Sequence, residues 1–437
     1  MAKTIKNWGG TVSFNPKFIR YPTSHEEVVE IVKTARQNRQ QVRVIGSGHS
    51  WTSLVNTHQI LISLDRYQGI INLDTVNCTA VVKAGTKLKL LGELLHAEGL
   101  AMENMGDINV QSIAGALSTG THGTGVKFGT LATQMLEITF VNGLGETVVC
   151  SEHTNREIFK AAQISLGALG IITKIKLRLV PTFKLEYVSL KANLDDTLLQ
   201  LDKYKQENRN FEFYWFPHTK TVQLKLVNKT PAPPKNVGLV KKFNDVVMEN
   251  GVFGLLSRVS RAFPKMAPRI SKISAWGVSK GTYINHSHLI FATQRWVRFY
   301  EMEYNIPQEC FISAIKEIEA CVNKNQFKVH FPVECRWVQA DDIMISPANG
   351  RDSAYIAIHM YKGMEYKAYF EAIEQIFRKY GGRPHYGKMN TLKQVDFAEL
   401  YPNWQKFMDM REQMDPDKVF LNAYLEELFV QKTLQEP

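Results

Sequence analysis

The sequence is poor in cysteine, and its thiols are not arranged for metal or disulfide chemistry. The five cysteines are Cys78, Cys150, Cys310, Cys321 and Cys335. No two of them have the C-x-x-C spacing of zinc sites and redox motifs, and their number is odd. This pattern argues against a zinc site or a disulfide framework, so we expect reduced thiols in a cytosolic protein and no bound metal.

The sequence also lacks an apolar run long enough to span a bilayer. The first residues, MAKTIKNWGG, lack the apolar core of a secretory signal peptide, so we expect a cytoplasmic protein. Residues 251–279 are the nearest membrane candidate, because they mix Leu, Val and Phe with Arg and Lys and contain no acidic residue. Such a segment could lie on a membrane surface. Pro264 and Pro268 interrupt any long helix there, which favours a loop or short helices.

The sequence also lacks a cluster of basic residues. The formal net charge is +11, but the Lys and Arg residues are spread along the chain. A nucleic-acid-binding protein would gather them on one stripe or patch, so we expect no nucleic-acid partner. A basic surface could instead attract acidic substrates or anionic lipid.

The order of predicted elements indicates two α+β parts in a chain of 437 residues. Up to Pro181, short strands alternate with helices; after it, longer alternating strands and helices predict an antiparallel sheet covered by helices on one face. In the first part we predict a helix from the capping box Ser24–Glu27 to about Asn38, a strand over 41–45, and a helix capped by Thr86. In the second part the predicted strands include 184–190, 210–216, 221–227, 296–304, 329–338 and 353–360, and the predicted helices are 195–208, 307–323 and 365–380. Residues 230–235 read as an exposed connection.

A glycine loop, VRVIGSGHSW over residues 42–51, follows the predicted strand 41–45. Glycines allow backbone N–H groups to approach a phosphate closely. A Rossmann site would need a third glycine, and here Gly46 and Gly48 are followed by His49, Ser50 and Trp51. The loop therefore predicts a phosphate contact only weakly when taken alone, and the histidine needs another explanation.

Two further runs of small residues follow this loop. Residues 106–125, GDINVQSIAGALSTGTHGTG, are almost entirely small or hydroxyl-bearing, which suits a backbone that wraps a large polar ligand such as a pyrophosphate. Residues 165–173, SLGALGIIT, form a glycine-marked turn that feeds a strand.

In this order, the three runs resemble the FAD-binding domain of the vanillyl-alcohol oxidase-type flavoproteins. The resemblance extends along nearly the whole chain to the sugar-1,4-lactone and alditol oxidases. Val333-Glu334-Cys335-Arg336 resembles their E-x-R pair, and residues 383–388, RPHYGK, resemble their H-W-x-K motif with Tyr386 in place of Trp. Residues 415–416 and 420–425 resemble their C-terminal signature.

The resemblance implies a two-subdomain FAD-binding domain of the PCMH type over residues 1–181 and a substrate-binding cap domain over 182–375. Residues 376–437 would complete the active site and return to the FAD domain. It implies FAD as cofactor, covalently linked through its 8α-methyl group to His49. The implied cofactor-binding residues are Val44, Ile45, Gly46, Ser47, Gly48, His49, Ser50, Gly106, Asp107, Ser112, Gly115, Thr119, Gly120, Thr121, His122, Ile171, Ile172 and His385.

The same resemblance also implies which residues contact the substrate. Glu334 and Arg336 lie two apart on a predicted strand, so both face one side. Glu334 would bind a sugar hydroxyl, Arg336 would stabilise the reduced flavin, and Lys388 would stabilise the developing alkoxide. His359 matches a histidine that contacts substrate, and a buried structural histidine is the close alternative.

The implied activity is hydride transfer from a carbinol carbon of a sugar lactone to flavin N5, with reoxidation by oxygen to hydrogen peroxide. An alditol oxidase, or a lactone dehydrogenase with a quinone or cytochrome acceptor, is the alternative. Gly106 stands where oxygen-excluding dehydrogenases of the family carry Ala, which favours an oxidase. Asp107 stands where the family often has Ser, in the segment that faces substrate, so the family's polyol contacts do not carry over to this position. The sequence does not fix the oligomeric state.

Overall fold

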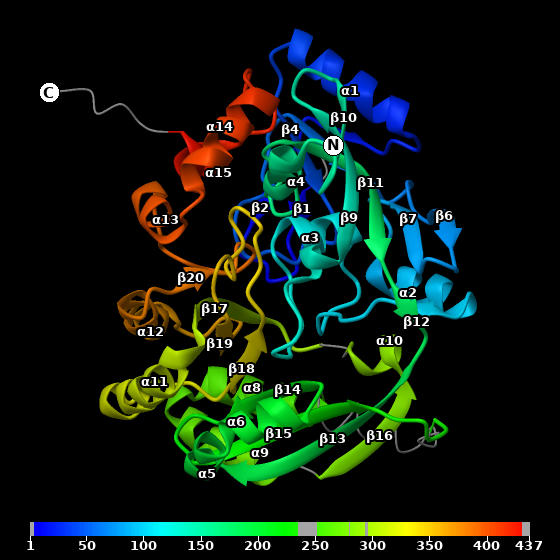
Figure 1. Cartoon of the computed structure of the whole chain (residues 1–437). Helices are drawn as coiled ribbons and strands as arrows, with labels where there is room; N and C mark the ends of the chain where they lie inside the picture. Colours follow the sequence, from blue (N-terminus) through cyan, green and yellow to red (C-terminus); the bar gives the residue numbers. More distant parts are fainter. Residues whose placement is uncertain (1–3, 235–250, 279, 293–295, 431–437) are drawn as a thin grey trace, which may run out of the picture.

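The computed structural model describes residues 4–234, 251–278, 280–292 and 296–430. The chain folds into two parts, which lie one above the other in Figure 1. The upper part contains the N-terminal half and the C-terminal helices, and the lower part is built on one large sheet. Within the described ranges, no helix has both the length and the apolar character needed to cross a bilayer.

The upper part contains two main sheets. A three-stranded parallel sheet has the order β3-β5-β4, and a five-stranded antiparallel sheet has the order β10-β9-β11-β7-β6. The strands are β3 (Phe18–Arg20), β4 (Val42–Ile45), β5 (Ile60–Ser63), β6 (Ile70–Asp74), β7 (Thr79–Lys83), β9 (Met135–Asn142), β10 (Thr147–Ser151) and β11 (Gly170–Arg178). The helices are α1 (His25–Gln37), α2 (Leu88–Ala97), α3 (Ile113–Ser118) and α4 (Arg156–Ala162). The two sheets agree with the predicted α+β fold.

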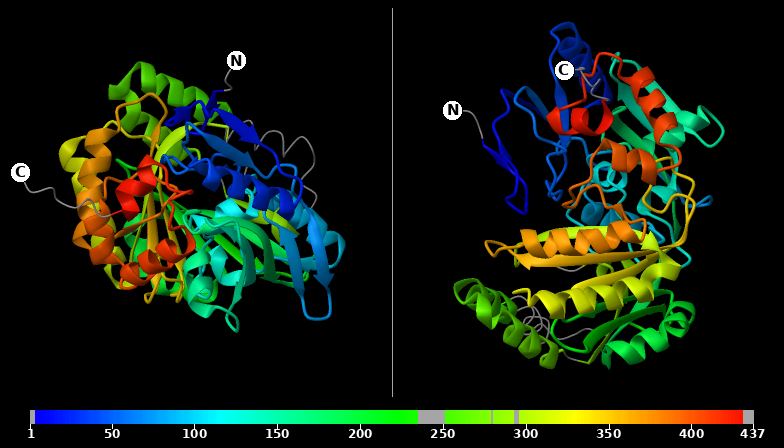
Figure 2. Two further views of the ribbon diagram at one scale, coloured as in Figure 1. Left: turned by 90° about the horizontal axis from the view of Figure 1, so that it is seen from above. Right: turned by 90° about the vertical axis from the view of Figure 1, so that its left-hand side faces the viewer.

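The lower part is an eight-stranded sheet with the order β16-β13-β15-β14-β18-β19-β17-β20, all of whose pairs are antiparallel. Its strands are β13 (Lys184–Asn193), β14 (Asn210–Trp215), β15 (Thr221–Lys229), β16 (Gly281–His286), β17 (Phe299–Pro307), β18 (Val333–Val338), β19 (Ser353–Tyr361) and β20 (Arg383–Pro384). Its helices are α5 (Leu194–Leu199), α6 (Leu201–Glu207), α8 (Phe253–Ala262), α9 (Ala267–Trp276), α10 (Ser287–Ile290), α11 (Phe311–Asn325) and α12 (Lys367–Lys379). Figure 2 shows α11 and α12 beside the strands of this sheet.

The two faces of this sheet differ because side chains alternate along each strand. On β18, the Trp337 ring packs at 5.0 Å from Phe311 of α11, so this side of the strand belongs to the helix-covered core. Glu334 and Arg336 point the other way, toward the upper part, where Arg336 lies 3.8 Å from Asp107. The alternation therefore gives the sheet one apolar face against helices and one charged face against the upper part.

The C-terminal segment returns to the upper part through α13 (Gln394–Leu400), α14 (Trp404–Met414) and α15 (Ala423–Phe429). The Val42 amide donates to the Val419 carbonyl at 2.8 Å, and the Asn422 side-chain amide donates to the carbonyls of Ser53 and Asn56. The segment thus buttresses the strand that leads into the glycine loop.

Several local predictions need correction. Ser24 accepts a hydrogen bond from the Glu27 amide, but the Glu27 carboxylate bonds Thr23 rather than Ser24, so the capping box is only half formed. Lys87, not Thr86, is the N-cap of α2, because the Thr86 hydroxyl donates to the Lys83 carbonyl.

Two segments of the lower part also differ from the prediction or refine it. The predicted helix 195–208 is two helices that meet at Gln200. Residues 251–278 form short helices, as the prolines predicted, while Ser279 and Lys235 lie outside the described residues.

Candidate functional site: two cavities that share one histidine

Two cavities lie next to each other in the described structure: the first lies within the upper part, and the second lies between the upper part and the charged face of the large sheet. The first comprises about 1080 Å³ of space between atoms and the second about 620 Å³, and in both cases part of this space is open to solvent. His49, Ser50, Gln111 and Thr119 line both of them. His49 therefore stands at the junction of the two spaces.

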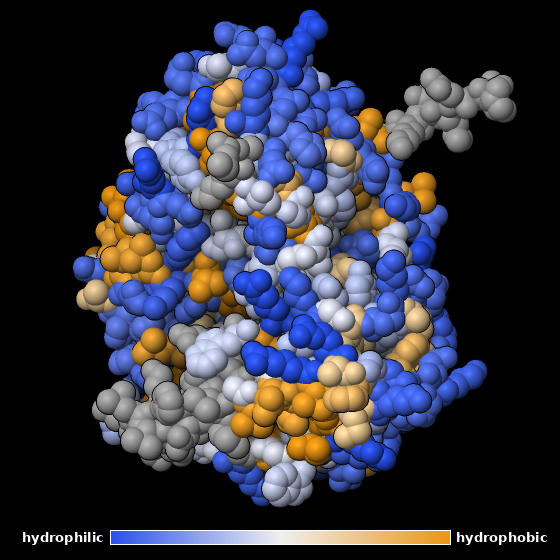
Figure 3. All heavy atoms as spheres, turned by 180° about the vertical axis from the view of Figure 1, so that it is seen from behind, coloured by the Kyte–Doolittle hydropathy of each residue, from blue (hydrophilic) through white to orange (hydrophobic). Residues whose placement is uncertain are grey.

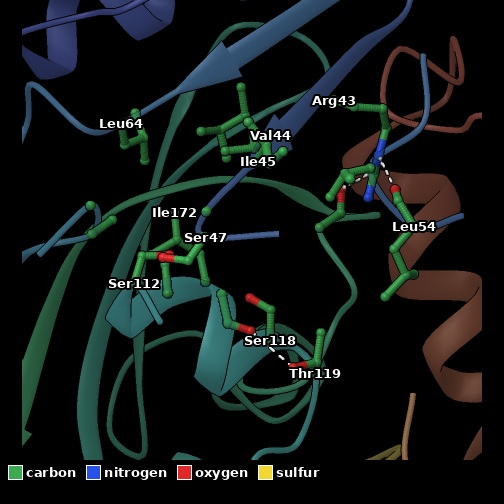
Figure 4. Close-up of a pocket in the computed structure, with 18 of the residues that line it drawn as sticks. Arg43, Val44, Ile45, Ser47, Leu54, Leu64, Ser112, Ser118, Thr119 and Ile172 are labelled. Atoms are coloured by element: carbon green, nitrogen blue, oxygen red, sulfur yellow. Dashed lines mark hydrogen bonds between the residues drawn. The ribbon is translucent and has the colours of Figure 1, made fainter. Parts of the chain in front are cut away.

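The first cavity is enclosed by the three glycine-rich runs. Figure 4 shows Val44 and Ile45 of β4 on one side of the pocket and Ser118 and Thr119, at the end of α3, on the other. The predicted cofactor-binding residues that line it are Val44, Ile45, Gly46, Ser47, Gly48, His49, Ser50, Ser112, Gly115, Thr119, Ile171 and Ile172. Phe420 of the C-terminal segment completes the lining.

The second cavity holds the charged residues. The predicted residues that line it are His49, Ser50, Asp107, Thr119, Thr121, His122, Glu334, Arg336, His385 and Lys388. Gly106, Gly120 and His359 are not among the lining residues of either cavity. Gly106 lies directly behind Thr121 and His122, since a Cβ atom there would be 3.2 Å from Thr121 Cγ2 and 3.1 Å from the His122 carbonyl oxygen.

Two glycines of the first cavity, Gly46 and Gly115, lie so close to Ser112 that a side chain at either position would crowd its hydroxyl group. A Cβ atom on Gly46 would lie 2.3 Å from Ser112 Oγ, and one on Gly115 would lie 3.0 Å from the same atom. Gly48 has φ of +68°, in the left-handed region that favours glycine. Close backbone approach and hydroxyl side chains are what a dinucleotide pyrophosphate requires, so these residues fit FAD.

His49 combines burial with an unsatisfied nitrogen. Its ring is stacked on Trp8 at 5.6 Å between centroids, and its Nδ1 atom is buried without a hydrogen-bond partner among the described residues. A buried polar atom without a partner costs about 1–3 kcal/mol, so a bond to a ligand would relieve that cost. Burial, reinforced by the charge of Lys388, lowers the pKa of His49 to about 4. The imidazole is therefore neutral, and its lone pair is available as a nucleophile.

Arg43 ties the walls of the first cavity together. The buried guanidinium donates to four carbonyl oxygens, those of Leu54, Leu166, Gly167 and Phe420, at 2.6–3.1 Å. These carbonyls come from three segments far apart in the sequence. Burial lowers the pKa of Arg43 to about 10, and it remains charged at neutral pH. The sequence prediction missed this residue, because no local pattern marks a contact that spans the chain.

Arg336 is held between two carboxylates on the charged face. It pairs with Glu334 on its own strand, and its Nε atom lies 2.7 Å from Glu212 Oε2 on the neighbouring β14. The register that places Glu212 opposite Arg336 makes this contact possible. Burial opposes ionisation of Glu212, but the charges of Arg336 and Lys225 keep its pKa below the ordinary value.

Two neighbours complete this cluster. The Tyr214 hydroxyl donates to Glu334 Oε1 at 2.6 Å, and Lys225 Nζ lies 3.0 Å from Glu212 Oε1. Both carboxylates are thus supported by strands other than their own. A Glu334 oriented by Tyr214 and Arg336 is suited to accept a hydrogen bond from a substrate hydroxyl.

Lys388 occupies the other side of the second cavity. Its Nζ atom lies 2.5 Å from Glu301 Oε2 and 4.5 Å from the centre of the Trp51 ring. His359 Nε2 lies 3.5 Å from the other Glu301 oxygen, while His359 Nδ1 is 3.0 Å from the Pro332 carbonyl. Burial alone would raise the pKa of Glu301, but Lys388 and His359 hold it at about 2. His359 therefore lies behind Glu301 and outside the lining of the cavity.

A second acid–histidine pair lies nearby. His122 Nε2 is 3.1 Å from Glu303 Oε1, and the His122 ring stacks on Tyr355. His385 is fully enclosed, and its Nδ1 atom accepts a hydrogen bond from the Gly387 amide at 3.0 Å. Burial lowers the pKa of His385 to about 4, so it is neutral.

Glu301, Glu334 and His359 offer ligand atoms within 4.8 Å of one another, which is close enough for a metal ion. Lys388 and Arg336 already pair with the two carboxylates. A divalent cation would have to displace both cations, so we assign no metal to this position.

Glu212, Tyr214, Glu301 and Glu303 were missed by the sequence prediction, although a signal was present. Each pair has i, i+2 spacing on a predicted strand, as Glu334 and Arg336 do. Polar residues at alternate positions on three strands of one sheet indicate a shared charged face. Trp8 carried no such signal, because it follows a two-residue strand, β1 (Ile5–Lys6).

Comparison with known protein families matches two profiles to this chain. That of the FAD binding domain matches residues 16–151, and that of D-arabinono-1,4-lactone oxidase matches residues 175–428. The L-gulono-1,4-lactone dehydrogenase of Mycobacterium tuberculosis is 37% identical over 424 residues, covering 97% of this chain and 98% of the relative. The L-gulonolactone oxidase of Bos taurus is 35% identical over 432 residues, with 97% and 98% covered.

Among solved structures, a solvent-stable cholesterol oxidase has a TM-score of 0.84 at 18% identity and covers 98% of both chains. Cholesterol oxidase from Brevibacterium sterolicum has a TM-score of 0.78 at 18% identity, with 98% and 97% covered. At this identity the likeness concerns the fold alone, and it confirms the predicted fold class.

Proposed function

The chain belongs to the D-arabinono-1,4-lactone oxidase family, and from this premise we propose that it is an FAD-dependent oxidoreductase that oxidises a sugar 1,4-lactone. The chemistry that FAD supplies at this site is acceptance of a hydride at N5 from the lactone's carbinol carbon, with reoxidation by oxygen to give hydrogen peroxide. The observation that carries the proposal is the pair of cavities joined at His49, one lined by glycines and hydroxyls and the other by paired charges.

The residues of the second cavity divide the work on the substrate. Glu334, held by Tyr214 and Arg336, accepts hydrogen bonds from sugar hydroxyls. Lys388, held by Glu301, stabilises negative charge on the carbinol oxygen as the hydride leaves. Arg336 stabilises the negative charge that arrives on the cofactor side. Because these cations are already fixed by buried carboxylates, they need little reorganisation during the reaction.

We further propose that His49 is covalently bonded to the 8α-methyl group of FAD. Support comes from its place at the junction of the cavities, its neutral and buried ring, and its unpaired Nδ1 atom. Acid precipitation of the purified protein should leave the flavin on the polypeptide, and mass spectrometry should find it on the peptide that contains His49. His49→Ala should release the flavin in acid, whereas the exposed His58→Ala should not. Flavin that washes out of the wild type would refute the covalent bond and leave the lactone activity to be judged separately.

The identity of the electron acceptor is the second question at this site. A 37% identical relative is a dehydrogenase, whereas the relatives from Bos taurus and Scyliorhinus torazame are oxidases. Gly106 favours oxygen as the acceptor. Peroxide release and dye reduction, measured with one panel of aldonolactones and polyols, separate an oxidase from a dehydrogenase and a lactone substrate from an alditol.

A further inference from the structure

Helices α8 and α9 differ from ordinary amphipathic helices, because small polar residues occupy much of their buried side. Ser257, Ser260 and Ser271 are buried. Ile270 is buried as well, but two large apolar side chains point outward: Phe263, in the turn after α8, is 65% exposed and Trp276, at the end of α9, is 81% exposed. The two helices pack on each other as a hairpin, joined by a turn at Pro264–Met266. A hairpin that exposes its largest apolar residues marks an interaction surface.

The exposed face of α9 mixes apolar and basic residues. Arg269, Lys272, Ile273 and Trp276 are all exposed, and their spacing of three, four and seven residues places them on one side of the helix. On α8, Leu255 is 60% exposed and Arg258 follows it by three residues. Figure 3 shows apolar side chains gathered on the lower part of the rear face, with hydrophilic ones above them, and Figure 2 places the yellow-green hairpin on that side.

The charge of this hairpin has a single sign. Residues 251–278 contain five basic residues and no acidic one. The basic residues are Arg258, Arg261, Lys265, Arg269 and Lys272. A second copy of the chain would bring the same positive surface to a two-fold interface, where like charges repel. An anionic surface is complementary to it.

We propose that the α8–α9 hairpin docks this protein on anionic phospholipid membranes. Trp and Phe side chains are favoured at the boundary between lipid headgroups and acyl chains, and neighbouring Arg and Lys residues bind anionic headgroups. Each basic residue near the surface strengthens binding to anionic lipid by about fivefold. The surface is independent of the proposed lactone oxidation, which uses none of these residues.

The hairpin is also anchored beside the catalytic cavity. Phe253, at the start of α8, packs at 4.9 Å from Phe331, which lies 5.7 Å from Phe299 in the wall of the second cavity. His330 Nε2 contacts Ser257 Oγ at 3.0 Å. Docking through the hairpin would therefore hold the second cavity close to the lipid surface.

Vesicle flotation with the full-length protein tests this proposal. Wild type should float with vesicles of phosphatidylcholine and phosphatidylglycerol at low salt, but not with phosphatidylcholine alone. The double variant Arg269→Glu/Lys272→Glu should bind at least about twenty-five-fold more weakly, since two attractive charges are lost. Phe263→Ser/Trp276→Ser should weaken binding that persists at high salt, where charge attraction is screened.

The matched control is Leu199→Ser/Lys203→Glu, which changes an exposed apolar and an exposed basic residue elsewhere on the cap domain. It should bind vesicles as the wild type does. Flavin content and thermal unfolding report whether each variant is folded, without reference to catalysis. Wild type that ignores anionic vesicles, or hairpin variants that bind as well as the control, would overturn the proposal. Concentration-dependent dimerisation that only the hairpin variants lose would point to a second copy instead.

Discussion

Lys388 and Glu301 form a buried ion pair with 2.5 Å between Nζ and Oε2, although one comes from the segment after β20 and the other from β17. His359 lies behind Glu301, with 3.5 Å between Nε2 and Oε1. The pair fixes a single cation in the wall of the second cavity, next to Trp51 and within the electrostatic reach of His49. A fixed cation is what a developing alkoxide requires.

Replacement of Lys388 by methionine should remove this stabilisation while keeping most of the side-chain volume. We expect kcat to fall by about 10²–10³-fold, the range for loss of one preorganised charge donor. Flavin content should be unchanged, because Lys388 lines the second cavity and not the first. Lys406→Met, on the exposed side of α14, is the matched control and should retain wild-type turnover. Equal loss of flavin and activity would show that Lys388 is structural.

Arg43→Met should weaken cofactor retention without touching the substrate cavity. The change leaves four buried carbonyl oxygens without their donor, each at a cost of about 1–3 kcal/mol if no water replaces it. Thermal unfolding should occur at a clearly lower temperature, and the flavin-to-protein ratio should fall. Arg20→Met, an exposed substitution on β3 of the same half, should change neither quantity. Normal flavin content in the Arg43→Met variant would contradict the proposed role of Arg43 in holding the walls of the first cavity together.

Gly106→Ala tests the choice of electron acceptor. The added Cβ would be 3.1 Å from the His122 carbonyl and 3.2 Å from Thr121 Cγ2, so the wall of the second cavity must move by a few tenths of an ångström. We expect oxygen-dependent turnover to fall by about tenfold, which corresponds to about 1.4 kcal/mol of barrier. Dye-coupled oxidation of the same lactone should persist. Parallel loss of both activities would mean that the substitution disturbs the fold and not the access of oxygen.

Stability should fall as the medium becomes acidic, because burial lowers the pKa of His330 to about 4. In the unfolded chain the His330 imidazole binds a proton at about pH 6.5. As pH decreases, the unfolded chain therefore takes up this proton before the folded chain does. The contribution of the neutral His330 to the free energy of unfolding is fully present above pH 6.5 and is lost as pH falls through 4. It amounts to about 3 kcal/mol at most. Urea unfolding of His330→Gln should therefore depend less steeply on pH than that of wild type. His153→Gln, on the surface, should leave the slope unchanged.

The sequence predicted those parts of the site that rest on local periodicity or on motifs. Glu334 and Arg336 share a face because strand side chains alternate, and the structure brings them into direct contact. The glycine loops meet around one cavity: the first follows β4, the third feeds β11, and the second contains α3. The cofactor and substrate roles of these residues stay predictions until the variants are measured.

The rest depends on contacts between distant segments. Arg43 and Phe420 are 377 positions apart, and nothing near either residue shows that they meet. The stacking of Trp8 on His49 likewise depends on how the N-terminal strands fold back. Glu301 and Glu303 had a readable alternation, but only the strand order places them beside Glu334.

The most direct test of the account is oxygen uptake by the purified flavoprotein in the presence of aldonolactones. We predict that one lactone of the panel bleaches the flavin spectrum in the absence of oxygen. Admission of oxygen should restore the spectrum with one hydrogen peroxide formed per lactone oxidised. If no aldonolactone bleaches the flavin, lactone oxidation is contradicted; if bleaching occurs but oxygen does not restore the spectrum, the oxidase assignment is contradicted.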